Sequence, residues 1–207
     1  NQGSERKCNL RKVHKTMGKL GGLIDCVGGM PRSRIETNDD EDAPIYDVYS
    51  QTNLLADRSG VVTENIDSKK IRTKDNVDSL QEGDIVFSLI SGNAAVVSKE
   101  HNAYLYPHNY IKLIPDENVN AKFLVYLLNE DKGIRKQLAM GTQGSQIIKY
   151  TIKQLKELEL PVLPSLDRQK AIGEIYSKSL MVEALKKRVA HLETILQLHV
   201  LEEEMKK

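Results

Sequence analysis

The spacing of hydrophobic residues changes once along the chain, close to residue 160. Before that point, apolar residues come in short runs that are rich in β-branched side chains and end at turn residues, which predicts short strands. The clearest runs are 45–49, 60–63, 85–90, 94–97 and 104–114. Ser91, Gly92 and Asn93 separate two of these runs, a pattern typical of a β-hairpin turn.

Short helices are predicted between the last of these strands and residue 160. Asn120 is a suitable N-cap for the first helix, and Thr151 with Gln154 forms a capping-box pattern for the last one. The apolar faces of the first two helices consist of Phe123, Leu124, Leu127 and Leu128, and then of Ile134 and Leu138. Strands followed by helices predict an α+β fold, with a mixed α/β domain.

A single long helix is predicted for the C-terminal part. Pro161 breaks the chain, Ser165 is a plausible N-cap, and the helical pattern continues to about Glu204. Such a helix is about 60 Å long at 1.5 Å per residue, so part of it must project or cover another chain. We therefore divide the chain into a recognition domain, residues 1–160, and a linker with a long helix, residues 161–207.

The long helix carries an apolar seam. Most of its members follow the 3-4 spacing with which one helix packs against another. The seam consists of Ile175, Val182, Leu185, Val189, Leu192 and Leu196. A second stripe, defined as Ile195, Leu198, Leu201 and Met205, indicates a contact on another side. We expect the seam to mediate homodimerisation through a coiled coil; a helix folded back on its own domain is the alternative.

Charge is segregated along the sequence although the formal net charge is only +1. Residues 5–34 carry eight Lys or Arg against two acidic residues, a net charge of +6, and residues 36–47 carry six acidic residues and no Lys or Arg. Two more basic runs are Lys69, Lys70, Arg72 and Lys74, and then Lys132, Arg135, Lys136, Lys149, Lys153 and Lys156. Segregated charge can present a basic face to phosphates, whereas solvated faces are the alternative.

The sequence offers no constellation for catalysis or metal binding. It has no P-loop and no GxGxxG after a strand. Cys8 and Cys26 lie outside metal-ligand spacing, and the five histidines are scattered. Ser88 and Ser91 lie near His101, but the sequence supplies no third group to orient a base. We therefore expect a protein that is not an enzyme and that binds no cofactor or metal itself.

No stretch approaches the roughly 18 apolar residues of a membrane span, and the N-terminal region has no apolar signal segment. From this, and from two cysteines that need not be paired, we expect a cytoplasmic protein that does not contact a membrane.

Several segments together resemble the specificity subunits of type I restriction–modification enzymes. These are LGGLIDCVGGMPRSR at 20–34, EGDIVFSLISGNAAVV at 82–97, 107–112 with 123–128, GTQGS at 141–145, and TIKQLKELELPVLPSLDRQKAIGEIY at 151–176. They follow the order of the family and cover most of the chain. The family more usually has the pattern EEQ at this point, whereas this sequence has Asp167, Arg168 and Gln169.

The resemblance implies a target recognition domain that binds double-stranded DNA, followed by a helix that serves as a spacer. A full subunit of this family has two such units with antiparallel helices and reads a bipartite target. The chain resembles one half of it. The resemblance also implies that modification (methyltransferase) subunits bind the assembly, and that S-adenosylmethionine, ATP and Mg²⁺ belong to partner subunits.

Three groups of residues are candidates for DNA contact. Arg32, Ser33 and Arg34 follow the Gly28–Gly29 pair, where backbone can approach a ligand, and arginine can bind guanine or phosphate. The polar loop after residue 141 offers groups that can read base edges: Thr142, Gln143, Ser145 and Gln146. The remaining candidates are Lys69, Lys70, Asn93 and Lys149.

Two other function classes remain open. The chain could be a regulatory protein that pairs through its helix with a full-length specificity subunit and does not bind DNA. It could also be a stand-alone enzyme with an unrecognised site, against which the missing motifs count. DNA affinity that falls steeply with salt favours recognition, and helix-dependent binding without DNA affinity favours regulation.

Overall fold

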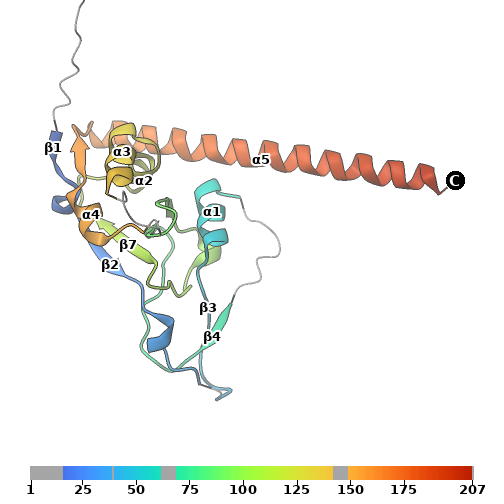
Figure 1. Ribbon diagram of the computed structural model, residues 1–207, viewed down its shortest axis with the longest axis horizontal. Coiled ribbons are helices and arrows are strands. Elements are labelled where there is room, and N and C mark those ends of the chain that lie inside the picture. The colour runs from blue at the N-terminus through green and yellow to red at the C-terminus, as the bar shows by residue number, and fades with distance from the viewer. Residues whose placement is uncertain (1–15, 39, 62–68, 142–148, 207) are drawn as a thin grey trace, which may run out of the picture.

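The computed structural model describes residues 16–38, 40–61, 69–141 and 149–206 (Figure 1). The helices are α1 Gln51–Ser59, α2 Ala121–Glu130, α3 Lys132–Met140, α4 Ile152–Glu157 and α5 Leu166–Met205, with short 3-10 turns η1 Leu20–Gly22, η2 Arg32–Arg34 and η3 Lys99–His101. The strands are β1 Thr16–Lys19, β2 Ile24–Gly28, β3 Ile45–Asp47, β4 Lys70–Arg72, β5 Ile85–Ser88, β6 Ala94–Val96, β7 Tyr110–Pro115 and β8 Glu159–Pro161.

A four-stranded sheet lies at the centre of the body, with strand order β2-β7-β5-β6. Every neighbouring pair is antiparallel. β7 is a central strand, in which Ile111 pairs with Gly28 of β2 on one side and with Phe87 of β5 on the other. Two smaller antiparallel pairs, β1 with β8 and β3 with β4, complete the strands.

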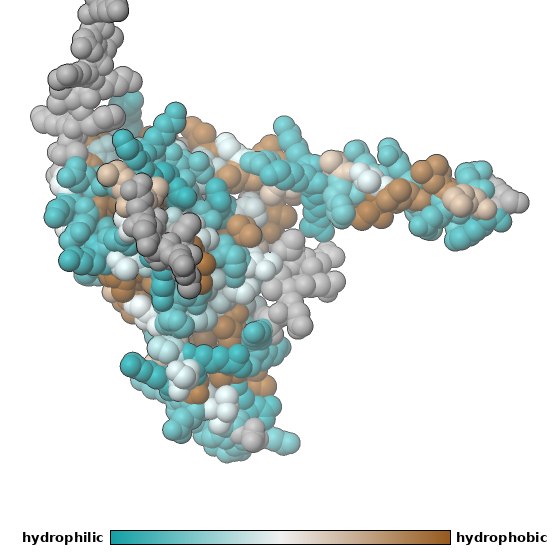
Figure 2. All heavy atoms as spheres, in the orientation of Figure 1, coloured by the Kyte–Doolittle hydropathy of each residue, from teal (hydrophilic) through white to brown (hydrophobic). Residues whose placement is uncertain are grey.

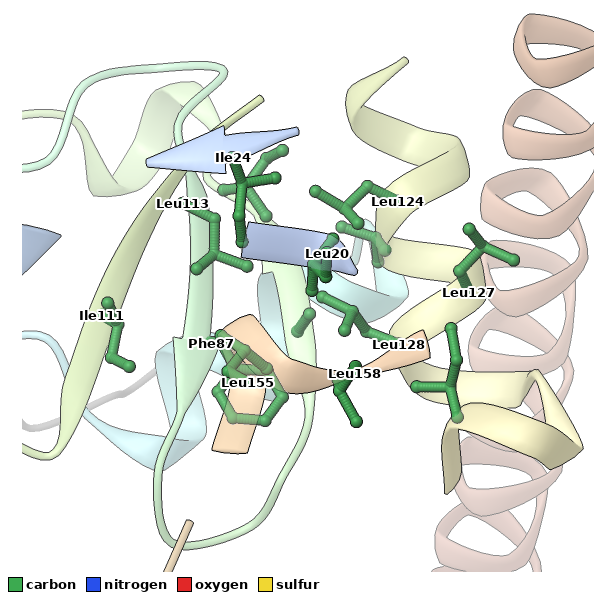
Figure 3. Close-up of a cluster of buried hydrophobic side chains, with 14 of the residues drawn as sticks. Leu20, Ile24, Phe87, Ile111, Leu113, Leu124, Leu127, Leu128, Leu155 and Leu158 are labelled. Carbon is green, nitrogen blue, oxygen red and sulfur yellow. The ribbon is translucent and has the colours of Figure 1, made fainter. Parts of the chain in front are cut away.

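The sheet separates two hydrophobic clusters because side chains alternate between its faces. Phe87, Ile111 and Leu113 point into the larger cluster, which α2, α3 and α4 close (Figure 3). Val86 and Tyr110 point to the other face, into a smaller cluster with residues of α1 and of the loops around it. Both faces of the sheet are therefore buried.

Helix α2 packs between the sheet and α5. Its side chains Leu124 and Leu128 are fully buried against the sheet, and Tyr126 forms an edge-to-face ring pair with Tyr176 of α5 at 5.5 Å. Asn120 caps α2 by accepting a hydrogen bond from the Phe123 amide at 3.1 Å, which confirms the predicted helix start.

The predicted long helix is confirmed as α5, with Ser165 at its N-cap and Asp167 in its first turn. Gln169 and Gly173 are buried, whereas from Leu185 onward every described residue of the helix is exposed. Figure 1 shows the consequence: α5 lies along the body at its start and then extends far beyond it. The mixed α/β fold with a long C-terminal helix is therefore confirmed.

Three local features differ from the sequence predictions. Residues 51–59 form α1 directly after a segment predicted as a strand, because Ser50 and Asn53 form a complete capping box. Gly60, expected to begin a strand, instead ends α1 in the left-handed conformation at φ 64°. The strand β8 was not predicted, because it is three residues long and pairs with the distant β1.

Candidate DNA interface

One end of the four-stranded sheet collects most of the turns that carry predicted DNA-binding residues. β2 and β5 end there, and β6 and β7 begin there, because all four strands are antiparallel. We call the turns at this end, residues 29–34, 89–93, 107–109 and 149–151, the sheet-end surface. Segments that are more than 100 residues apart, such as 29–34 and 149–151, are thus brought to one edge.

The turn η2 presents Arg32, Ser33 and Arg34 with exposed side chains. It rests on a small apolar pocket beneath it, and the Arg34 amide closes the turn by donating to the Pro31 carbonyl at 2.9 Å. The pocket is lined by Met30, Arg32, Ile35, Val48, Ile71, Leu105, Tyr106 and Pro107. Among the described residues, neither Arg32 nor Arg34 has a carboxylate within ion-pair distance. Both guanidinium groups are therefore available to a phosphate or a base.

Gly29 serves the fold in a way that the sequence did not indicate. A Cβ atom at this position would lie 2.2 Å from the Tyr106 carbonyl oxygen and 2.4 Å from that of Pro107. The Gly29 amide also donates to the Tyr110 carbonyl at 3.0 Å. We had expected the space above this glycine to be open to a ligand. It is instead filled by the protein's own backbone.

The β5–β6 hairpin places Asn93 close to Lys149. The Tyr150 amide donates to the Leu89 carbonyl at 2.8 Å, and the Tyr150 ring covers Gly92, where a Cβ atom would approach the ring to 2.5 Å. Two predicted residues that are distant in sequence therefore flank the same hairpin. The other predicted readers, Thr142, Gln143, Ser145 and Gln146, lie outside the described residues.

Three residues of this region were missed at the level of sequence. Arg135 of α3 donates to the Gly92 carbonyl at 2.6 Å, and so holds the hairpin from below. Ile90 and His108 are exposed on neighbouring turns of the sheet-end surface. Arg135 belongs to a basic run, which was a usable signal, whereas Ile90 and His108 are recognised only once the turns come together.

The predicted cations of β4 are in a different environment. The β3–β4 pairing sets Lys70 opposite Asp47, and the Lys70 ammonium lies 4.0 Å from the Asp47 carboxylate. Lys74 forms an ion pair with Asp40, which lowers the pKa of that carboxyl group. Lys69 is exposed. The fold thus brings this basic run next to the acidic segment 36–47, and the two partly neutralise each other. This weakens the positive electrostatic potential that the run presents to phosphates.

Most of the seam lies on the side of α5 that faces away from the body. Residues Ile175, Val182, Leu185, Val189, Leu192 and Leu196 have exposed fractions of 45–68%. The buried Gln169 and Gly173 mark the opposite side, at the period of 3.6 residues per turn. Figure 2 shows apolar side chains along the projecting part of α5. Such a row of exposed apolar side chains is typical of an interaction surface.

The second stripe continues the side of α5 that faces the body. Leu180, Ala184 and Ile195 line hollows between α5 and α1, opposite Leu55 of α1, and Leu192 at the edge of the seam lines one of them as well. Leu198, Leu201 and Met205 follow Ile195 beyond the body and are 55–88% exposed. The helix therefore has two apolar faces with different surroundings.

Asp57 and His101 form a buried pair between α1 and η3. His101 Nδ1 lies 2.7 Å from the Asp57 carboxylate, and its Nε2 lies 3.0 Å from the Asn53 side-chain amide. The Asn53 amide donates, so Nε2 accepts and Nδ1 donates to Asp57. Ser88, in contrast, is engaged at the sheet end, where its hydroxyl oxygen accepts from the Ile90 and Ser91 amides. The pair therefore joins α1 to η3 and presents no free ring nitrogen to a nucleophile.

Two further observations concern the described part of the chain. It contains no cluster of three or more His, Cys, Asp or Glu that could hold a metal ion. None of its helices combines the length and the apolar character that crossing a bilayer requires.

Comparison with protein families gives a match over residues 13–193 to the model described as type I restriction modification DNA specificity domain. The match covers the predicted recognition domain from β1 onward and most of α5. Comparison with curated proteins gave no match.

Two solved structures are similar to the chain. The HsdS subunit from Thermoanaerobacter tengcongensis shares 18% identity at a TM-score of 0.53, over 82% of this chain and 38% of that protein. The second is a chain from a structure that describes complex assembly and conformational transition of the type I R-M system. It shares 19% identity at a TM-score of 0.56, over 87% of this chain and 42% of that chain. At these identities the likeness concerns the fold. The chain spans about two fifths of the length of both relatives.

Proposed function

The chain belongs to the family of type I restriction modification DNA specificity domains, and on that premise we propose that it is a non-catalytic DNA-recognition subunit that reads one half of a bipartite target. The observation that carries the proposal is the family match over residues 13–193. The structure supports it with a body that presents free cationic groups and a helix that projects from that body. Such a subunit would bind double-stranded DNA in the cytoplasm.

The sheet-end surface is the proposed reading face. Arg32 and Arg34 are exposed on one of its turns, and Asn93 and Lys149 flank another. Arginine pairs with guanine edges or phosphates, and asparagine can pair with adenine. Lys149 follows residues 142–148 directly in the sequence, so we include Thr142, Gln143, Ser145 and Gln146. Lys69 and Lys70 lie outside the sheet-end surface, and we assign them to contacts with the phosphate backbone farther along the DNA.

We propose that two copies of the chain pair through their α5 seams, and that the resulting dimer recognises a bipartite target. Burial of the exposed seam against a second copy removes apolar surface from water at about 25 cal/mol per Å². The antiparallel direction is the arrangement that the family resemblance implies. It would place two bodies at opposite ends of the paired helices, each with its own half-site.

The second stripe is the proposed docking face for modification subunits. At 3.6 residues per turn Leu198, Leu201 and Met205 lie largely on the other side of α5 from the seam, so a second copy bound at the seam would leave these three residues uncovered. Leu198, Leu201 and Met205 would then pack against apolar residues of a methyltransferase subunit, which supplies S-adenosylmethionine and the chemistry. ATP and Mg²⁺ would belong to a restriction subunit.

A regulatory protein is the second candidate function. One observation favours it: exposed apolar residues of α5 continue beyond the body, and neither the seam nor the second stripe includes a residue of the sheet-end surface. The chain could therefore pair with the helix of a full-length specificity subunit without binding DNA. In that case it would reduce DNA binding by the complete enzyme.

The two candidates are separated by selection from a random DNA library. The chain is incubated with modification subunits, bound DNA is isolated by gel shift, and the pool is sequenced. Recognition predicts an enriched motif and an affinity that falls steeply with salt. A pool without enrichment, together with helix-dependent capture of a full-length specificity subunit, would reject the first function and support the second.

A further inference from the structure

Helix α5 is fastened to the body by residues near its start, and Gln169 is the most buried polar one. Its side chain is 2% exposed. Its Oε1 atom accepts from the Asn120 amide at 2.9 Å, and its Nε2 atom donates to the carbonyls of Asn118 and Pro164, each at 3.0 Å. One amide thus joins α5 to the linker before it and to the N-cap of α2.

One turn later, Gly173 lets α5 and α2 come into backbone contact. A Cβ atom at this position would lie 2.7 Å from the Lys122 Cβ and 2.8 Å from the Phe123 backbone nitrogen. Its φ angle is not positive, so the glycine is required for space and not for backbone conformation. Any larger residue would force the two helix axes apart.

A second set of contacts follows on the next turn. The Tyr176 hydroxyl donates to the Glu130 carboxylate at 2.8 Å, and Arg58 of α1 donates to the same oxygen at 3.2 Å. Three helices, α1, α2 and α5, therefore meet at one carboxylate. Two separated attachment points along α5 define its direction, whereas a single point would allow it to swivel.

We propose that Gln169 and Gly173 are positioning residues that fix the direction in which α5 leaves the body, and thereby the distance between the two DNA half-sites. The part that concerns half-sites rests on the proposed function. The part that concerns helix direction does not. Neither residue contacts DNA in this proposal; both act through α5.

The length of the helix makes its direction important. From Gly173 to Val189, in the middle of the seam, α5 rises about 24 Å at 1.5 Å per residue. A swing of about 10° about the attachment would displace the body by about 4 Å relative to the dimer axis, close to the 3.4 Å rise of one base pair. A loose attachment would therefore blur the spacer by about one base pair.

Helix direction is measured by the distance between two spin labels in the folded protein. Labels at Lys99→Cys on η3 and Gln197→Cys on α5, in a Cys8→Ala and Cys26→Ala background, report the angle between body and helix. Dilution with unlabelled chain limits the signal to one protomer. We expect a narrow distance distribution for the parent, and a broader or displaced one for Gln169→Met and for Gly173→Ala.

Matched controls change the same residue types where the structure gives them little to do. Gln81→Met removes an exposed glutamine whose one side-chain bond, to Ser79, is 3.4 Å long, and Gly22→Ala adds a methyl group into open space. Both should keep the parent distribution. Gly173→Ala also favours an isolated helix, so a disturbed angle in this variant cannot come from a weakened α5.

The same variants are then used to select DNA with spacers of different length. We expect an unchanged half-site sequence and a wider range of accepted spacers, a readout that lower stability alone would not move. An unchanged distance distribution in folded Gln169→Met and Gly173→Ala would overturn the proposal. If Gln169→Met does not fold, Gly173→Ala decides alone.

A changed distribution with an unchanged spacer range would overturn the link to half-site spacing. If neither parent nor variant selects any sequence, the proposed function fails, and the distance measurement still decides whether these residues direct α5.

Discussion

At the scale of single residues, the basic side chains of the body differ in what surrounds them. Arg32 and Arg34 stand on an exposed turn, whereas Lys70 and Lys74 each face a carboxylate. A cation that already has an anionic neighbour must give up part of that interaction when it binds phosphate. Such a cation therefore contributes less free energy to DNA binding than an unpaired one.

The first prediction compares these two pairs. Arg32→Ala with Arg34→Ala should weaken DNA binding by about 1–3 kcal/mol if either arginine contacts a base. Lys70→Ala with Lys74→Ala should cost less, below about 1 kcal/mol, because each lysine already has a carboxylate partner and makes at most a distant phosphate contact. Fluorescence titration at low and moderate salt measures both. Unchanged affinity of the arginine variant at low salt would remove these residues from the interface.

The second prediction concerns base reading by the loop after Gly141. Gln143→Ala with Gln146→Ala should change which sequences are selected more than it changes non-specific affinity, since glutamine reads adenine through paired donor and acceptor groups. Sequencing of the selected pools tests this. Identical pools for parent and variant would argue against a reading role.

The third prediction concerns alkaline pH. Burial raises the pKa of Tyr110 to about 12, and burial with the Asp57 carboxylate raises that of Tyr49 as well. Unfolded tyrosines ionise near pH 10. Above that pH the unfolded state loses protons that the folded state keeps, so stability is complete below pH 10 and falls as pH rises toward 12.

Urea unfolding at a series of pH values, with tyrosinate absorbance as the second signal, measures this loss. Tyr110→Phe keeps the ring and removes the ionisable group, so it should lose less stability than the parent between pH 10 and pH 12. Equal pH dependence in both proteins would contradict the assignment.

At the scale of elements, α5 is one helix with two surroundings. Its first turns bury Gln169 and Gly173 against α2, and its later turns expose apolar side chains on two faces. The exposed faces cannot be explained by packing within the described body. The alternative of a helix folded back on its own domain therefore holds for the beginning of α5 and fails for the remainder.

The fourth prediction tests the seam. Leu185→Glu with Leu192→Glu places charge at the centre of the proposed contact, so it should give a folded monomer that binds DNA weakly and at one site. Ala190→Glu with Gln197→Glu, outside the seam and the second stripe, should remain dimeric. Sedimentation measures both. A parent chain that is monomeric at about 100 μM, with or without DNA, would favour the regulatory alternative.

At the scale of the whole molecule, the described chain has one body and one long helix, and the chain spans about two fifths of the length of its structural relatives. A twofold dimer uses the same body twice, and a twofold axis relates its two half-sites. A subunit with two different bodies would instead read two unlike halves.

The fifth prediction follows from this symmetry. The motif that the homodimer selects should be an interrupted palindrome, with half-sites inverted about a spacer of fixed length. Sequencing of the selected pool shows it directly. A motif with one half-site, or with two unlike halves, would contradict the twofold dimer.

The sequence by itself determined the elements whose signals are local. The caps at Asn120, Thr151 and Ser165 mark helix starts that the structure has, and the 3-4 spacing of the seam is a property of one helix. The α+β class and α5 follow from such short-range periodicity, because the period is set by backbone geometry. The family resemblance came from several segments in a fixed order, because no single motif was specific enough.

Only the tertiary structure decided which of these signals meet. It joined Asn93 to Lys149 through the contact of Tyr150 with Gly92, and it set Lys70 and Lys74 against the acidic segment. It also placed backbone above Gly29, and it turned the side of α5 that carries Ile195 toward α1. These facts depend on strand pairing and helix packing between residues far apart in the chain, about which hydrophobic period and local charge carry no information.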